Sequence, residues 1–213
     1  MKTRYLVVGG SLLVLACVLV GASSVQAQTP TLGDVSETSA ALLSSQQRHL
    51  WRVAAWGGLN AAGGLALLLA SNRTEHAARR AFGLQAGLWG LINVGIATIG
   101  LVNIPDAPLT DYAGVLSAER AYHDILLLNM GLNVAYSSVG VVMLVAGYRD
   151  VRAAASWRGH GTALILQGAG LFVLDGISLL ASRTRLADLL PVAGDVVAGA
   201  GPLGATLAVH VPF

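Results

Sequence analysis

Four long apolar stretches separated by short polar loops dominate the pattern of hydrophobic and polar positions. They cover residues 53–71, 81–104, 121–147 and 160–182, and Asp175 is the charge that lies well inside one of them. A helix needs about 20 apolar residues to cross the hydrocarbon core of a bilayer. No stretch shows the period of two that a membrane-barrel strand requires. The pattern therefore predicts an all-α membrane protein, a bundle of four transmembrane helices.

The N-terminal segment, residues 1–27, has the features of a secretory signal peptide. Lys2 and Arg4 precede an apolar run, and small residues stand at the cleavage-determining positions before and at Ala27. We predict cleavage after Ala27. Two alternatives stay open: the segment is retained as an additional span, or it is lipidated at Cys17.

The rest of the chain divides into three parts by polarity. Residues 28–47 form a polar segment on the outer side of the membrane, 48–182 the four-helix domain, and 183–213 a C-terminal tail. From residue 203 to 213 the tail alternates with a period of two, which predicts a short strand. The pair 196–197 is a candidate partner for this strand in a small hairpin.

The loops differ in charge, which predicts the orientation of the chain. Loops 72–80 and 148–160 each carry three arginines, whereas loop 105–118 carries Asp106 and Asp111 and no lysine or arginine. Short arginine-rich loops remain in the cytoplasm. We therefore predict a multi-pass protein of a bacterial inner membrane with both mature termini on the periplasmic side.

Composition narrows the classes of function. Apolar residues make up 54% of the 213 residues and charged residues 11%, against about 25% charged in soluble domains. The net charge of +2 is too small for a nucleic-acid binder. Cys17 is the single cysteine, which excludes an intramolecular disulfide. No nucleotide or hydrolase motif is present, so we expect no cofactor. The expected partner is the lipid bilayer, and homo-oligomerisation stays open.

Short sequence repeats relate the helices to one another. Residues 56–60 and 89–93 both read W-G-x-x-N. Gln85 precedes the second asparagine by eight residues, and Gln167 precedes Asp175 by eight. These matches are compatible with a duplicated helical hairpin and also with chance.

Polar residues recur at intervals of four and so share one face of each helix. The rows are Arg52, Trp56, Asn60 and Gly64; Gln85, Trp89 and Asn93; Asn129, Asn133 and Ser137; and Gln167, Leu171 and Asp175. Polar groups that face lipid are costly, so we expect all four rows to turn inward. We hypothesise that Asn60, Asn93, Asn129, Asn133 and Asp175 form one connected belt. With Gln85 and Gln167, the belt is a candidate ligand site or proton pathway; alternatively, the amides only hold the helices together.

A second candidate site uses histidines near the outer ends of the helices. His49 and His123, with Asp124, offer two imidazoles and a carboxylate, a set that binds metals. No ligand spacing within one helix supports this site. The alternative is that the histidines are solvated or paired with Glu119, which together with Arg120 we interpret as a charge at the rim of the bundle.

The signal segment, the two W-G-x-x-N motifs and His123-Asp124 leading into Asn129 and Asn133 resemble a family of small bacterial four-helix membrane proteins. The resemblance covers residues from about 46 to 182. It implies no catalytic residues, because the family has no assigned function. We expect a structural or accessory membrane component. The alternatives are a small transporter or proton-linked channel that uses the belt, and, third, an enzyme with an outer-face His/Asp site.

Overall fold

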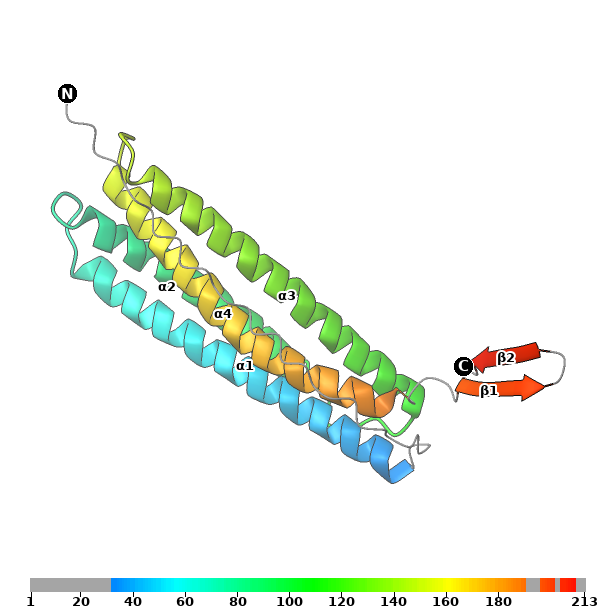
Figure 1. Ribbon diagram of the computed structural model, residues 1–213. Coiled ribbons are helices and arrows are strands. Elements are labelled where there is room, and N and C mark those ends of the chain that lie inside the picture. Colours follow the sequence, from blue (N-terminus) through cyan, green and yellow to red (C-terminus); the bar gives the residue numbers. More distant parts are fainter. Residues whose placement is uncertain (1–31, 191–195, 202–203, 210–213) are drawn as a thin grey trace.

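Four long helices form an antiparallel bundle in the computed structural model, which describes residues 32–190, 196–201 and 204–209 (Figure 1). The helices are α1 (Leu32–Leu69), α2 (Ala77–Val102), α3 (Tyr112–Ala146) and α4 (Ala154–Leu189). All four are long and apolar enough to cross a membrane. The predicted signal segment and Cys17 lie outside the described residues.

The helix ends follow local sequence signals, but the helices extend beyond the apolar stretches. Asp111 caps the N-terminus of α3, where its carboxylate accepts a hydrogen bond from the backbone N–H of Gly114 at 2.6 Å. α2 ends at Val102, shortly before Pro105. α1 begins at Leu32, so most of the segment expected to be a polar flank is helical.

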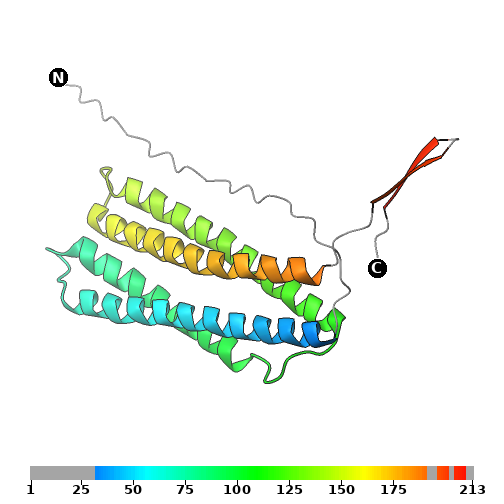
Figure 2. The same cartoon turned by 60° about the horizontal axis from the view of Figure 1, so that its bottom comes forward.

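The bundle consists of two tightly packed hairpins, α1 with α2 and α3 with α4 (Figure 2). Glycines allow both close approaches: a Cβ atom at Gly57 would lie 2.7 Å from the Gly90 carbonyl oxygen, and one at Gly140 would lie 2.7 Å from that of Gly161. Gly58, by contrast, faces open space. Helix α4 packs on α2 and to a lesser extent on α1, whereas in the described bundle the backbones of α2 and α3 stay apart and the Trp89 and Tyr136 side chains meet between them.

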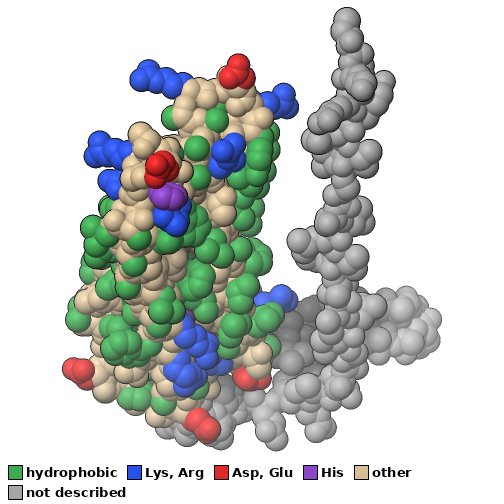
Figure 3. All heavy atoms as spheres, turned by 90° about the vertical axis from the view of Figure 1, so that its left-hand side faces the viewer, with side chains coloured by type: hydrophobic (Ala, Val, Ile, Leu, Met, Phe, Trp, Pro, Cys, Tyr) green, Lys and Arg blue, Asp and Glu red, His purple; other side chains and the backbone are tan. Residues whose placement is uncertain are grey.

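The distribution of polar and apolar side chains is the inverse of that in a soluble domain. Leu59, Ile99 and Val142 are 65–72% exposed, and apolar side chains cover much of the surface that Figure 3 shows. Buried polar side chains include Asn93, Asn133, Gln167, Asp175, His49 and Glu119. Large apolar surfaces are stable in contact with lipid, and buried polar groups need partners. This distribution indicates a multi-pass membrane protein.

Six arginines lie in or beside the loops between α1 and α2 and between α3 and α4, and Figure 3 shows basic side chains at the opposite end as well. Arg80 donates to the Leu68 carbonyl oxygen at 3.0 Å, and Arg158 donates to that of Gly147 at 3.0 Å. These carbonyls lie at the C-terminal ends of α1 and α3, where cations are favourable. The arginines therefore also stabilise the helix ends.

Two short strands follow the bundle. β1 (Val196–Gly201) pairs antiparallel with β2 (Gly204–Val209), with Val196 opposite Val209. β2 covers residues 204–209 of the stretch in which the sequence alternates with a period of two, and residues 203 and 210–213 of that stretch lie outside the described residues.

Candidate ligand-binding site

A cavity of about 410 Å³ lies inside the half of the bundle that is remote from the arginine loops. All four helices contribute to it, and its volume is within the range of small-molecule pockets, about 300–1,000 Å³. It lies where the backbones of α2 and α3 stay apart. Toward the arginine end, the rings of Trp89 and Tyr136 meet edge to face with 4.9 Å between their centroids. Both rings line the cavity, so they mark its inner end.

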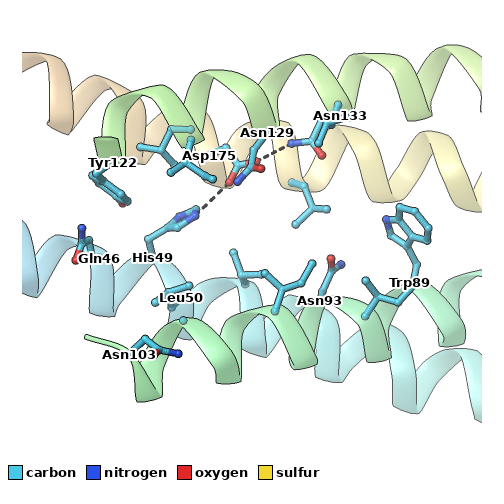
Figure 4. A pocket seen from close by; sticks show the side chains of 18 of the residues that line it. Gln46, His49, Leu50, Trp89, Asn93, Asn103, Tyr122, Asn129, Asn133 and Asp175 are labelled. Atoms are coloured by element: carbon cyan, nitrogen blue, oxygen red, sulfur yellow. Dashed lines mark hydrogen bonds and ion pairs between the residues drawn. The ribbon is translucent and has the colours of Figure 1, made fainter. Parts of the chain in front are cut away.

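Four buried side chains form a hydrogen-bonded network beside this cavity, and Figure 4 shows three of them, His49, Asp175 and Asn133. His49 Nε2 lies 3.2 Å from Asp175 Oδ1, and His49 Nδ1 lies 2.8 Å from the Ser178 hydroxyl. Asn133 Nδ2 donates to the other carboxylate oxygen of Asp175 at 2.6 Å. All four residues are at most 6% exposed. The network links α1, α3 and α4 and fixes the Asp175 carboxylate at the cavity wall.

Helical periodicity explains how one face of α4 supplies both partners of the imidazole. Asp175, Ser178 and Ser182 are three and four residues apart, and all three are buried on one face of α4. On α1, Ser45, His49 and Val53 form the corresponding buried row. The two rows meet at the imidazole.

The network accommodates either protonation state of the imidazole. When Nε2–H donates to Asp175, a neutral ring accepts the Ser178 hydroxyl proton at Nδ1, whereas an imidazolium donates to the Ser178 oxygen. The hydroxyl also has a second acceptor, the Leu174 carbonyl oxygen at 3.2 Å. Rotation of one hydroxyl therefore keeps every group hydrogen-bonded in both states.

The connectivity resembles that of a Ser-His-Asp triad, but it does not provide a nucleophile. His49 and Asp175 line the cavity, whereas Ser178 is not among the lining residues described. The Ser178 hydroxyl lies on the side of the imidazole opposite Asp175. A substrate in the cavity therefore does not reach the hydroxyl.

Several polar groups at the cavity have unused hydrogen-bonding capacity. Asn93 is 5% exposed, and its Nδ2 has no partner among the described residues. Its side chain rises from α2 into the cavity and faces Asn129, Asn133 and Asp175 on the far wall (Figure 4). The Tyr122 hydroxyl lies near the Ser45 and Ser178 side chains, but it makes no hydrogen bond with satisfactory geometry in the described structure.

The structure brings together four of the five residues of the hypothesised belt. Asn93, Asn129, Asn133 and Asp175 line the cavity. Asn60 does not; its amide donates to the carbonyl oxygen of Trp56 at 2.7 Å, one turn earlier on the same helix.

The two glutamines belong to a separate polar layer nearer the arginine end. Gln167 Oε1 accepts a hydrogen bond from Trp56 Nε1 at 3.1 Å, and Gln85 Oε1 lies 3.1 Å from His160 Nδ1. Neither glutamine lines the cavity. Both pairs connect helices of different hairpins, so they hold the hairpins together.

The expected inward row of α1 needs correction. Arg52 is exposed, and the buried face in this part of the helix contains Ser45, His49, Val53 and Gly57. Steps of four drift by about 40° each, so a row chosen from Trp56 and Asn60 leaves the buried face within two turns.

The histidines and Glu119 also differ from expectation. His49 is deep in the bundle with Asp175, while His123 lies 3.6 Å from its neighbour Asp124. Within the described ranges, no three His, Cys, Asp or Glu side chains group as metal ligands, so the structure does not assemble the predicted metal site. Glu119 is fully buried rather than at the rim, and it is held by Arg185 at 2.7 Å.

Sequence reasoning missed the His49–Asp175 pair, although a signal was present. Ser45 and His49 lie four residues apart on α1, and Asp175, Ser178 and Ser182 continue the polar face of α4. Extending each row in alternating steps of three and four would have placed the histidine opposite the acid.

The chain is all-helical in its main body, and four helices long and apolar enough to cross a membrane, with buried polar side chains and an internal cavity, are the features of the class of multi-pass membrane proteins. Within that class it belongs to the family of unknown function DUF6992, whose profile matches residues 52–176, more than half of the chain. No curated protein and no solved structure matches the chain.

Proposed function

We propose that this chain is an integral membrane protein that binds a small neutral amphipathic molecule, taken from the bilayer, in the cavity between α2 and α3. One observation carries the proposal: a cavity with buried hydrogen-bonding groups lies between two helices whose backbones stay apart. Ile96 on α2 and Ile125 on α3 line the cavity and are 58% and 51% exposed, so the cavity communicates with the apolar surface. A molecule dissolved in lipid therefore has a lateral entrance.

The proposal includes the membrane setting. The arginine loops are assigned to the cytoplasm and the loop with Asp106 and Asp111 to the opposite side. The signal segment, the inner membrane and the periplasmic termini belong to the same proposal. With this orientation, the cavity lies in the outer half of the bilayer.

A binding role accounts for the cavity better than a purely structural or accessory role, since a bundle that only supports a larger assembly gains nothing from a cavity with an unpartnered amide.

A channel needs a polar route through both halves of the bundle. Here the Trp89 and Tyr136 rings mark the end of the cavity, and Leu171 separates Asp175 from Gln167 along α4. Ligand binding therefore takes precedence over transport.

The test is to fill the cavity and measure which molecules remain bound. Ile96→Trp places an indole at the cavity wall, and Ile99→Trp places one on the same helix at a 65% exposed position away from the cavity. The full chain and both variants are purified in mild detergent, and extracted molecules are quantified by mass spectrometry per mole of protein.

We expect a near-stoichiometric neutral amphiphile in the unmodified chain and in Ile99→Trp, and a several-fold lower amount in Ile96→Trp. Ile125→Trp repeats the test from the α3 side if Ile96→Trp does not fold. Retention of the same molecules in equal amounts by all variants, or of none by the unmodified chain, contradicts the proposal.

A further inference from the structure

We infer that the molecule bound in this cavity is of the quinone class: a neutral ring with carbonyl oxygens and an apolar tail. This inference rests on the proposed function and adds the chemical identity of the ligand. It draws on the charge of the cavity, its unused hydrogen-bond donors, the His49–Asp175 pair and the opening toward lipid.

Charge at the cavity excludes the commonest lipid headgroups. No lysine or arginine is among the lining residues in the described chain. The imidazole of His49, the one lining side chain in the described residues that can carry a positive charge, is already engaged by Asp175 at 3.2 Å. A phosphate would meet the Asp175 carboxylate without a counter-cation, which is unfavourable in a site of low dielectric. The ligand headgroup is therefore uncharged.

The unused polar groups at the cavity call for a ligand that accepts hydrogen bonds. The Asn93 amide has a buried N–H donor with no partner in the described structure, and a buried unsatisfied donor is costly. Asn129, on the far wall, has an amide at the cavity for which the described residues provide no hydrogen bond. A ring carbonyl oxygen between these amides satisfies a donor that the protein leaves free.

The His49–Asp175 pair suits a ligand oxygen that changes between acceptor and donor. A quinone oxygen accepts hydrogen bonds, and the corresponding quinol hydroxyl donates one. The amides supply donors for the first form, and the Asp175 carboxylate, which lines the cavity, supplies an acceptor for the second. Both forms of the ligand oxygen therefore find a hydrogen-bonding partner on the cavity wall.

The shape of the site suits a ring with a tail. The Trp89 and Tyr136 rings at the inner end provide aromatic surface for a planar headgroup. The exposed side chains of Ile96 and Ile125 border the opening toward lipid. A tail leaving between α2 and α3 stays in the hydrocarbon region, and only the ring needs to fit the cavity.

The experiment compares two probes that differ in their oxygens. The full chain in lipid nanodiscs is titrated with decylubiquinone and with decylbenzene, which has a ring and tail but no oxygen, and binding is followed by quenching of tryptophan fluorescence or by competition. Asn93→Leu removes the unpartnered donor. Asn60→Leu is the matched control, because that asparagine lies outside the cavity and bonds its own helix.

We expect decylubiquinone to bind more tightly than decylbenzene, and Asn93→Leu to weaken quinone binding by about tenfold, the value of one hydrogen bond. The same variant keeps or raises the thermal stability of the empty protein, since it removes a buried unsatisfied group, so lost binding is distinguishable from misfolding. Asn60→Leu leaves quinone affinity unchanged.

Two results overturn the quinone inference while the proposed function stands: equal affinity for both probes with sensitivity to Ile96→Trp, or quinone binding that Asn93→Leu does not alter. If neither probe binds and no amphiphile co-purifies with the unmodified chain, the proposed function fails as well.

Discussion

The buried ion pair between Glu119 on α3 and Arg185 on α4 gives a quantitative prediction about stability. Glu119 is fully buried and accepts hydrogen bonds from Arg185 Nε at 2.7 Å and Nη2 at 3.0 Å, and from the Ser182 hydroxyl at 2.5 Å. Arg185→Met keeps an apolar stem of similar length but leaves the carboxylate with the serine alone. Breaking a buried pair from one side costs about 3–5 kcal/mol. Because the Arg185 side chain is 12% exposed, we expect the lower end, about 3 kcal/mol.

The assay is reversible unfolding of the purified chain in mixed micelles, followed by far-UV circular dichroism as the denaturing detergent is increased. Arg183→Met is the control, because Arg183 is exposed two residues away. The double variant Glu119→Gln/Arg185→Met removes both charges and should recover most of the loss. The reasoning is refuted if Arg185→Met lies within about 0.5 kcal/mol of the unmodified chain, or if the double variant is as unstable as the single one.

Three further predictions concern packing, the site and orientation. Gly57→Val overpacks the contact between α1 and α2 and should cost about 1–3 kcal/mol, whereas Gly58→Val, which meets open space, should not; thermal unfolding of both variants checks this difference. Ser178→Ala should lower stability by about 1 kcal/mol without reducing the co-purified ligand, because this hydroxyl does not line the cavity; ligand loss would contradict that placement. Cysteines introduced at Asp111 and Arg152 should react with an impermeant maleimide from opposite sides of the membrane, and reaction of both from one common side would contradict the assigned topology.

The number of helices and their approximate positions followed from sequence alone. Length, hydropathy and the prolines and polar residues of the loops are local properties, and a backbone in lipid must pair its hydrogen bonds within each segment. Hydropathy alone did not give the helix ends: α1 starts at Leu32, and α4 runs to Leu189, beyond the apolar stretches. The apolar stretches do not include these extensions, because the extensions are amphipathic. They pack on one another through Val35 and Leu189.

The sequence also determined which residues are polar within apolar helices, and thus four of the polar side chains that line the cavity. Asn93, Asn129, Asn133 and Asp175 were predicted to meet because amides and acids avoid lipid. What each of them contacts was decided by the tertiary structure. Asn133 bonds Asp175, whereas Asn93 is left without a partner among the described residues.

Only the tertiary structure decided how each helix is rotated and which distant residues pair. In water, the apolar side of a helix faces inward, so periodicity reveals the rotation. In lipid, apolar side chains are stable on both sides, and only the few polar residues indicate which side is buried. α1 carries two such rows, one through Ser45 and His49 and one through Arg52 and Asn60. The choice of the first row, which brings His49 within 2.8 Å of Ser178 across 129 residues of chain, depends on α4 packing beside it.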